Sequence, residues 1–166
     1  MNWYAVYTRS RHEQKANKRL LEKKIETFLP LIERWSRRKD RRKRIHIPLF
    51  PGYLFVRTLL EAQIHLEILK TDGVVRILGN NENPIPIPDK QIRAIQSLIR
   101  NGVAIERHPY LKEGMKVRVV NGPLTGIEGI LIKTQTKKNR LIISVDLLQE
   151  SVSVEMDDLD IEPIHL

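Results

Sequence analysis

The sequence has no cysteine, and this absence removes a whole class of sites. The chain can form neither disulfides nor thiolate metal centres, which fits a reducing cytoplasm. No apolar run approaches the roughly 18 residues that a membrane span needs. Residues 1–13 lack the charged segment and long apolar stretch of a signal peptide. We therefore expect a cytoplasmic protein that makes no membrane contact.

Signs of catalysis are also missing. The five histidines show no metal-ligand spacing, and no nucleophile elbow or phosphate-binding loop is present. The acidic end Asp157-Asp158-Leu159-Asp160 reads as a solvated turn. We expect no catalytic residues, no bound metal and no cofactor, so the protein is not an enzyme.

Acidic residues are scarce in the first part of the chain only. Residues 1–100 hold 21 basic and 10 acidic residues, a net +11, whereas residues 101–166 hold 8 and 10, a net −2. Such asymmetry indicates two modules with different partners. The positive charge of the first module predicts a polyanionic binding partner.

The first module alternates strand and helix patterns, which predicts an α+β domain with an antiparallel sheet flanked by helices. Ser10–Glu13 has the form of a capping box, in which Ser10 would accept a hydrogen bond from the Glu13 amide. The helix after it has an apolar face of Ala16, Leu20, Leu21, Ile25 and Phe28. Two more helices are expected at Glu61–Lys70 and from Asp89 onward. Strands are expected at Trp3–Thr8, Thr27–Trp35, Ile45–Ile47, Gly52–Arg57 and Val74–Leu78.

The pattern changes after residue 101. Residues 102–111 contain Gly102 and Pro109 and form the best linker candidate. Short strands follow, separated by turn residues, which predicts a small all-β barrel. They are expected at Lys116–Val120, Gly129–Thr134, Leu141–Val145 and Ser151–Glu155.

A dense basic run lies between two of the expected strands of the first module. From Arg34 to Arg44 there are eight basic residues and one acidic residue, and arginine outnumbers lysine six to two. A solvated hairpin tip that only aids solubility is the plain alternative. Arginine favours bidentate phosphate contacts, so we predict nucleic-acid binding, with RNA or single strands as plausible as duplex DNA. The candidate residues are Arg34, Arg37, Arg38, Lys39, Arg41, Arg42, Lys43 and Arg44.

The stretch PLFPGYLFV follows directly. In an extended strand Tyr53 and Phe55 face one side and Leu54 the other, so both faces are apolar. Most of these side chains are expected in the core of a sheet. Together with Tyr7 and Phe50 they also form a candidate aromatic patch, open to a partner.

The stretch Lys112–Lys133 contains several glycines. Those at 122, 126 and 129 permit positive φ and tight barrel corners. This string resembles a KOW motif, carried by Gly114, Lys116, Val117, Gly122, Gly126 and Gly129.

With WYAVYT and PLFPGYLFV, the KOW-like string resembles the NusG family of transcription elongation factors. The resemblance implies an NGN domain at 1–101, a linker at 102–111 and an SH3-like KOW barrel at 112–166. Within the family, the short length and the PLFPGYLFV form resemble the specialised RfaH and LoaP types. The basic loop at 37–44 favours the LoaP type, whose NGN domain is associated with an RNA hairpin in the nascent transcript.

The resemblance also implies partners and residues. The NGN domain would dock on the clamp helices of RNA polymerase and suppress pausing and termination without chemistry, as a bacterial, nucleoid-associated and monomeric factor. A basic patch could also meet upstream or non-template DNA. The implied polymerase-binding residues are Tyr7, Phe50, Tyr53, Phe55 and Ile77, with His65 at a second contact.

Two alternatives stay open. The first is a general elongation factor whose KOW domain binds the ribosome or a termination factor, and the second is a ribosomal or assembly RNA-binding protein with a KOW motif. RfaH-type KOW domains can refold into a helical hairpin. Here the runs Val117, Val119 and Leu141, Ile143, Val145 alternate with period two, which predicts a stable barrel and no autoinhibition.

Overall fold

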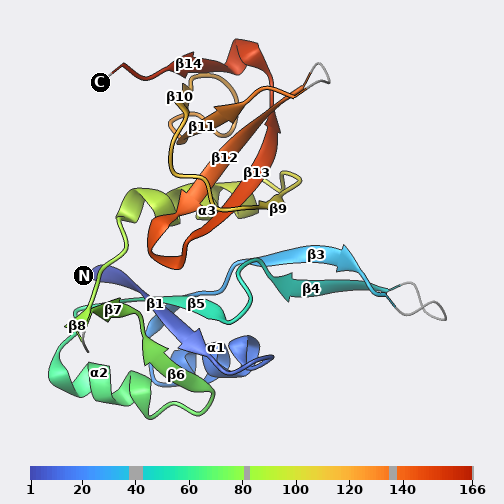
Figure 1. Cartoon of the computed structure of the whole chain (residues 1–166). Coiled ribbons are helices and arrows are strands. Elements are labelled where there is room, and N and C mark those ends of the chain that lie inside the picture. Colours follow the sequence, from blue (N-terminus) through green and yellow to red (C-terminus); the bar gives the residue numbers. More distant parts are fainter. Residues whose placement is uncertain (38–42, 81–82, 135–137, 166) are drawn as a thin grey trace. The chain divides into compact units, whose positions relative to one another are not determined.

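The computed structural model describes residues 1–37, 43–80, 83–134 and 138–165. The chain divides into two compact units, Met1–Asp89 and Lys90–Leu166, each of which is considered separately (Figure 1). The first unit mixes helices with antiparallel strands and the second is rich in β structure, as predicted. Among the described helices, none combines the length and the apolar character needed to cross a membrane.

A four-stranded antiparallel sheet forms the centre of the first unit, in the order β2-β5-β1-β6. β1 and β5 pair along six consecutive positions, from Asn2 opposite Thr58 to Tyr7 opposite Tyr53. β5 pairs on its other side with β2, and β1 with β6. The strand bounds are β1 Asn2–Thr8, β2 Glu26–Phe28, β5 Tyr53–Thr58 and β6 Val74–Ile77. The predicted strands Trp3–Thr8, Gly52–Arg57 and Val74–Leu78 are thus confirmed within one residue, whereas Thr27–Trp35, predicted as one strand, is interrupted after Phe28.

Helices α1 (Glu13–Glu22) and α2 (Ala62–Leu69) cover one face of this sheet. Strand residues alternate between faces, so every second side chain of β1 and β5 points toward the helices. The core on this face consists of Tyr4, Val6, Ala16, Leu20, Ile25, Leu54, Val56, Ile68 and Ile77. This core therefore accounts for the apolar side chains on one of the two faces of β5.

The start of α1 differs from the prediction. The helix begins at Glu13 with His12 as its N-cap residue, and no side chain caps it. Arg11 has a φ of 62°, a left-handed turn that separates Ser10 from the helix. The prediction of a capping box at Ser10–Glu13 was therefore wrong. The carbonyl of Ser10 instead contacts His12 Nδ1 at 2.8 Å.

The end of α1 also comes earlier than its apolar periodicity suggests. Lys24 has a φ of 62° and stops the helix just past Glu22. Ile25 and Phe28 therefore lie outside the helix, and Leu21 is 52% exposed instead of facing the core. Ile25, which precedes β2, still packs in the core with the helix, whereas Phe28 of β2 stacks on Phe55 on the other face of the sheet.

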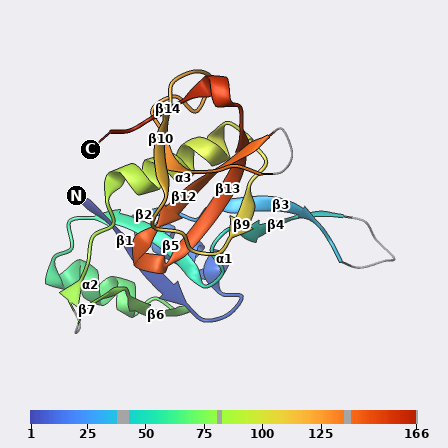
Figure 2. The same cartoon turned by 45° about the horizontal axis from the view of Figure 1, so that its top comes forward.

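A two-stranded hairpin projects from the first unit in both views (Figures 1 and 2). It pairs β3 (Leu31–Trp35) with β4 (Arg44–Pro48), from Leu31 opposite Pro48 to Trp35 opposite Arg44. The Leu49 amide closes its base by donating to the Pro30 carbonyl at 2.8 Å. A short pair, β7 (Gly79–Asn80) with β8 (Asn83–Pro84), follows later in the chain.

The second unit holds a six-stranded antiparallel sheet in the order β14-β10-β11-β12-β13-β9. Its strands are β9 Glu106–His108, β10 Met115–Val119, β11 Glu128–Ile132, β12 Asn139–Val145, β13 Glu150–Met156 and β14 Ile161–Pro163. Between residues 112 and 165 the described chain forms strands and two 3-10 turns and no α-helix. The exposed acidic end Asp158–Asp160 forms one of these turns, as predicted.

Helix α3 (Asp89–Arg100) lies at the division between the units. By its contacts, α3 belongs to the second unit from its second residue, Lys90, onward. β9 pairs with β13 and falls inside the segment predicted as a linker. The limits 1–101, 102–111 and 112–166 remain predictions of domain boundaries.

The glycines of the KOW-like string have two different structural roles. Gly122 and Gly126 have φ of 86° and 94°, as expected for tight corners. Gly129 lies within β11 and is not a left-handed residue, so the expectation of positive φ there was wrong. A Cβ atom at this position would lie 2.5 Å from the Ile142 carbonyl oxygen, so close strand approach is what requires glycine.

Candidate functional site

A tight turn leads from the hairpin into β5. The Tyr53 amide donates to the Phe50 carbonyl at 3.0 Å, with Pro51 and Gly52 between them. Gly52 has a φ of 88°, and Pro followed by a left-handed Gly is the chemistry of a type II turn. A Cβ atom on Gly52 would lie 3.2 Å from Cε2 of Tyr7. The PGY sequence therefore lets the Tyr7 ring lie against the turn.

Tyr7 and Tyr53 form a cross-strand pair at the end of β1 and β5. Their ring centroids are 5.3 Å apart at an angle of 48°. The guanidinium of Arg76 lies over the Tyr7 ring at 5.8 Å. Tyr7 is 36% exposed and Tyr53 is half-buried. This pair, with Arg76 at its edge, is the tyrosine patch.

The other aromatic residues predicted for this patch are buried. Phe55 is fully buried, with Phe28 stacked at 6.0 Å and Phe50 edge-on at 6.2 Å. Phe50 is 2% exposed. Tyr53 and Phe55 do share one face, as alternation predicts, but both phenylalanines are buried and are not part of the exposed patch.

The remaining two predicted contact residues lie elsewhere. Ile77 belongs to the core under α1 and α2, on the sheet face opposite Tyr7. His65 is half-buried on α2, the helix that covers this same opposite face. The structure therefore does not bring Ile77 or His65 together with the tyrosine patch.

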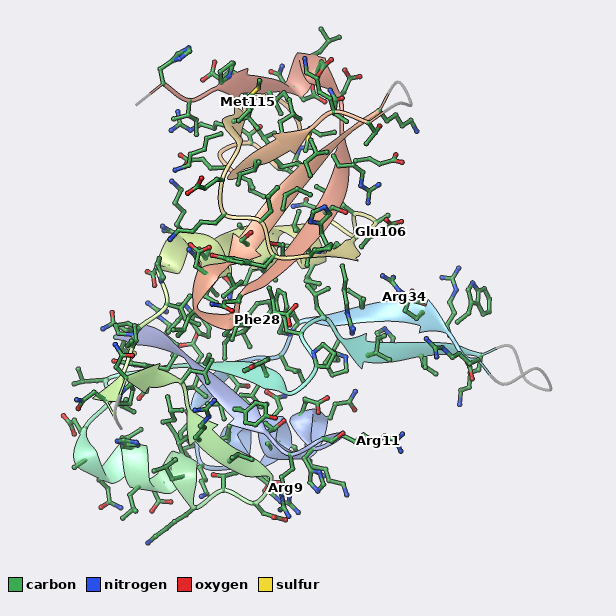
Figure 3. The ribbon with its side chains drawn as sticks, in the orientation of Figure 1. Arg9, Arg11, Phe28, Arg34, Glu106 and Met115 are labelled. Carbon is green, nitrogen blue, oxygen red and sulfur yellow. The ribbon has the colours of Figure 1, made fainter. Side chains whose placement is uncertain are left out.

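The described residues of the basic run lie on the outer part of the β3–β4 hairpin. Arg37, Lys43 and Arg44 are exposed, and Arg34 stands out from β3 (Figure 3). The Ser36 amide donates to the Lys43 carbonyl at 2.7 Å, which continues the ladder beyond the last strand pair. Four more candidates, Arg38, Lys39, Arg41 and Arg42, lie outside the described residues.

Trp35 is a functional candidate that the sequence reasoning missed. It ends β3, is 59% exposed, and lies opposite Arg44, whose guanidinium is 5.1 Å from the indole centroid. The available signal was an aromatic residue next to a basic run, which is the combination that binds nucleic acid by stacking.

The second unit contains an open groove of 1070 Å³ between α3 and the sheet. Of the KOW residues, Gly114, Lys116, Gly126 and Gly129 line it, whereas Val117 is buried in the core. Its basic side chains are Lys90, Arg93, Arg100, Lys112 and Lys116, and its acidic ones are Glu113, Glu128 and Asp146.

Hydrogen bonds set the ionisation of two groups beside this groove. Hydrogen bonds from Lys90 and then Arg118 lower the pKa of Glu128, and the Arg118 contact is 2.8 Å long. The hydroxyl of Tyr110 donates to Asp146 at 2.8 Å, which raises the pKa of Tyr110 because deprotonation would lose this bond. In the part of the chain that the structure describes, no three acidic or histidine side chains gather as a metal site.

Comparisons with known proteins agree with this architecture. The model of the NusG family, described as transcription termination factor NusG, matches residues 1–96. The chain is 28% identical to the transcription termination/antitermination protein NusG of Thermus thermophilus, covering 95% of both chains. It is 30% identical to the NusG of Buchnera aphidicola over 80% of this chain and 74% of that protein.

One solved structure shows the same fold. It is titled "Domain interaction in Thermotoga maritima NusG" and matches with a TM-score of 0.59 at 20% identity, covering 99% of this chain and 97% of the other. Both the mixed first unit and the β-rich second unit are therefore those of NusG proteins. The chain belongs to the NusG family of transcription factors, which act without catalysis.

Proposed function

We propose that this chain is a specialised antitermination factor of the bacterial cytoplasm. In this proposal the first unit holds RNA polymerase through the tyrosine patch and contacts a nascent RNA hairpin, or nearby upstream or non-template DNA, through the basic hairpin. The single observation that carries the proposal is the outer end of the hairpin, where the described basic residues Arg37, Lys43 and Arg44 are exposed. The LoaP-like placement within the family rests on this feature.

The polymerase contact rests on the exposure and chemistry of the tyrosine patch. Tyrosine and arginine are enriched at protein interfaces, and Tyr7, Tyr53 and Arg76 lie together near one end of the paired strands β1 and β5. Phe50 and Phe55 are buried, so they are not available for this contact. Contacts through Ile77 and His65 stay predictions of the resemblance, since neither lies on this face.

The effect on transcription would be conformational. A factor that binds the closed clamp more tightly than the open one shifts the polymerase toward the closed form. Pausing and termination would fall as a result. The RNA contact would recruit the factor to selected transcripts.

A general elongation factor is the second candidate. The relatives named above are NusG proteins, and the one from Thermus thermophilus matches along 95% of its length. In that case the second unit would couple to the ribosome or a termination factor through the mixed-charge groove. The two candidates differ in whether the chain binds RNA by itself.

RNA binding is the discriminating experiment. We expect the full chain to bind hairpin RNA with an affinity that falls steeply as salt rises. Replacing Arg37, Arg38, Arg41, Arg42 and Arg44 by Ala should lower both the affinity and the salt slope, because each lost phosphate contact removes roughly 0.7–0.9 from the slope. Unchanged binding by this variant would refute the RNA contact and favour the general factor.

Polymerase binding needs its own variant. Tyr53→Ala should weaken association with core polymerase while the chain stays folded, because the ring is half-buried and not part of the core under the helices. Tyr110→Ala in the second unit is the matched tyrosine control and should bind normally. Undiminished association of a folded Tyr53→Ala chain would refute the tyrosine patch as the docking surface.

A further inference from the structure

Trp35 is largely exposed to solvent and is not part of the buried core. The chain has two tryptophans, and Trp3 is 5% exposed whereas Trp35 is 59% exposed. Trp3 packs edge-on against Phe28, with ring centroids 6.4 Å apart. Trp35 lies at the last strand pair of a hairpin that leaves the sheet. Its indole therefore presents a wide aromatic surface to solvent.

Arg44 holds this indole on one side. The guanidinium lies 5.1 Å from the ring centroid, and its Nη1 also lies 3.4 Å from both carboxylate oxygens of Glu33. Glu33 and Trp35 share a strand face because they are two residues apart. The carboxylate thus orients the guanidinium and has its own charge compensated. The indole keeps more than half of its surface exposed with the guanidinium in place.

Exposed cations lie close to Trp35 along the chain and across the hairpin. Arg37 follows Trp35 by two residues, and Lys43 precedes Arg44. The hydrogen bond from the Ser36 amide to the Lys43 carbonyl keeps these two stretches of chain side by side. An aromatic face flanked by cations suits a nucleotide, because the base stacks on the ring and the phosphates meet the charges.

We propose that Trp35 is a stacking platform for one unpaired nucleobase, with Arg37 and Lys43 receiving the adjacent phosphates. The base must be unpaired, since both faces of a base inside a duplex are covered by its neighbours. This inference rests on the proposed nucleic-acid contact of the hairpin and adds the ligand: a single-stranded segment, such as a loop or a displaced strand. RNA and DNA share this chemistry.

Tryptophan fluorescence tests the stacking directly. The full chain with Trp3→Phe has Trp35 as its sole tryptophan, and the wild-type chain serves alongside it. We expect a short oligouridylate to quench this emission. A blunt RNA duplex and an abasic strand with the same number of phosphates should quench little. An oligothymidylate of equal length compares DNA with RNA as the source of the base.

Affinities of variants separate stacking from charge. Trp35→Ala should weaken binding of the oligouridylate roughly 5- to 150-fold, the loss expected for one stacked base, and leave abasic-strand binding unchanged. Trp35→Phe should retain most of the affinity because it keeps an aromatic face. A double variant, Arg37→Ala with Lys43→Ala, should weaken binding of all strands, abasic ones included.

The outcomes are distinguishable. If the charge variant loses affinity and Trp35→Ala does not, the stacking platform is wrong and the proposed nucleic-acid contact survives. If neither variant changes binding, both are wrong. If Trp35→Ala weakens association with polymerase and leaves nucleic acid unaffected, the indole belongs to a protein contact and the inference is overturned.

Discussion

The β3–β4 hairpin and strand β5 are neighbours in sequence with opposite environments. β5 pairs on both sides, with β2 and β1, and its Phe55 is fully buried. Among the residues that the structure describes, β3 and β4 pair only with each other, and Trp35 of β3 is 59% exposed. Both segments contain aromatic residues that favour strands. The difference lies in neighbours: a central strand commits its side chains to stability, whereas a projecting hairpin leaves them available for a ligand.

The largest expected effect comes from the central strand. Phe55→Ala should lower the free energy of unfolding of the first unit by about 3–5 kcal/mol, because a cavity replaces a ring packed against Phe28 and Phe50. Urea denaturation followed by the emission of Trp3 measures it, in a Trp35→Phe background. The contrasting change, Trp35→Ala followed by circular dichroism, should alter stability by less than about 0.5 kcal/mol. Comparable losses of stability in Phe55→Ala and Trp35→Ala would contradict the proposed contrast between β5 and the hairpin.

The turn that joins the two regions should have an intermediate effect. Gly52→Ala should cost about 1–2 kcal/mol because its φ of 88° is left-handed. The new Cβ would also press on the Tyr7 ring. In a Tyr7→Ala background the ring-dependent part should vanish, and the remainder reports the backbone alone. Equal costs in both backgrounds would show that Tyr7 tolerates the methyl group.

A smaller effect is expected from a paired charge in the second unit, which serves as a reference for both regions. Hydrogen bonds from Lys90 and Arg118 depress the pKa of Glu128, so its carboxylate stabilises the fold above the pKa of the unfolded chain. That contribution disappears as the pH falls through the lower, folded pKa. At neutral pH Glu128→Gln should cost about 0.2–1 kcal/mol, a typical value for exposed pairs.

Stability measured against pH checks this assignment. The wild-type chain and Glu128→Gln should differ at neutral pH and converge in acid. Glu113→Gln in the same groove is the control, since no hydrogen bond or ion pair is described for Glu113. A difference between wild type and Glu128→Gln that persists at low pH would contradict the ionic origin.

Local patterns predicted the strands well and the helix ends poorly. Alternation along β1, β5, β10 and β12 gave their bounds within one or two residues, because burial of one strand face leaves a period of two. The apolar period of α1 ran on through Ile25 and Phe28, although the helix ends at Glu22. Left-handed residues at Arg11 and Lys24 carry no such signal, since neither is Gly or Asn.

The candidate site was predicted in part. The residue types of the tyrosine patch and of the basic hairpin were recognisable from the chain. Burial of Phe50 and Phe55 was not, because aromatic residues on a strand look the same whether they face the core or a partner. The exposure of Trp35 was missed for the same reason.

By itself the sequence determined the class of each unit, the basic run between two strands and membership of the NusG family. These follow from periodicity, charge and backbone chemistry, which are local. Only the tertiary structure decided which aromatic rings are buried, that Ile77 lies on the face opposite Tyr7, and that Arg44 meets Trp35 across the hairpin. Those facts depend on strand order and register, which bring together residues far apart in the chain.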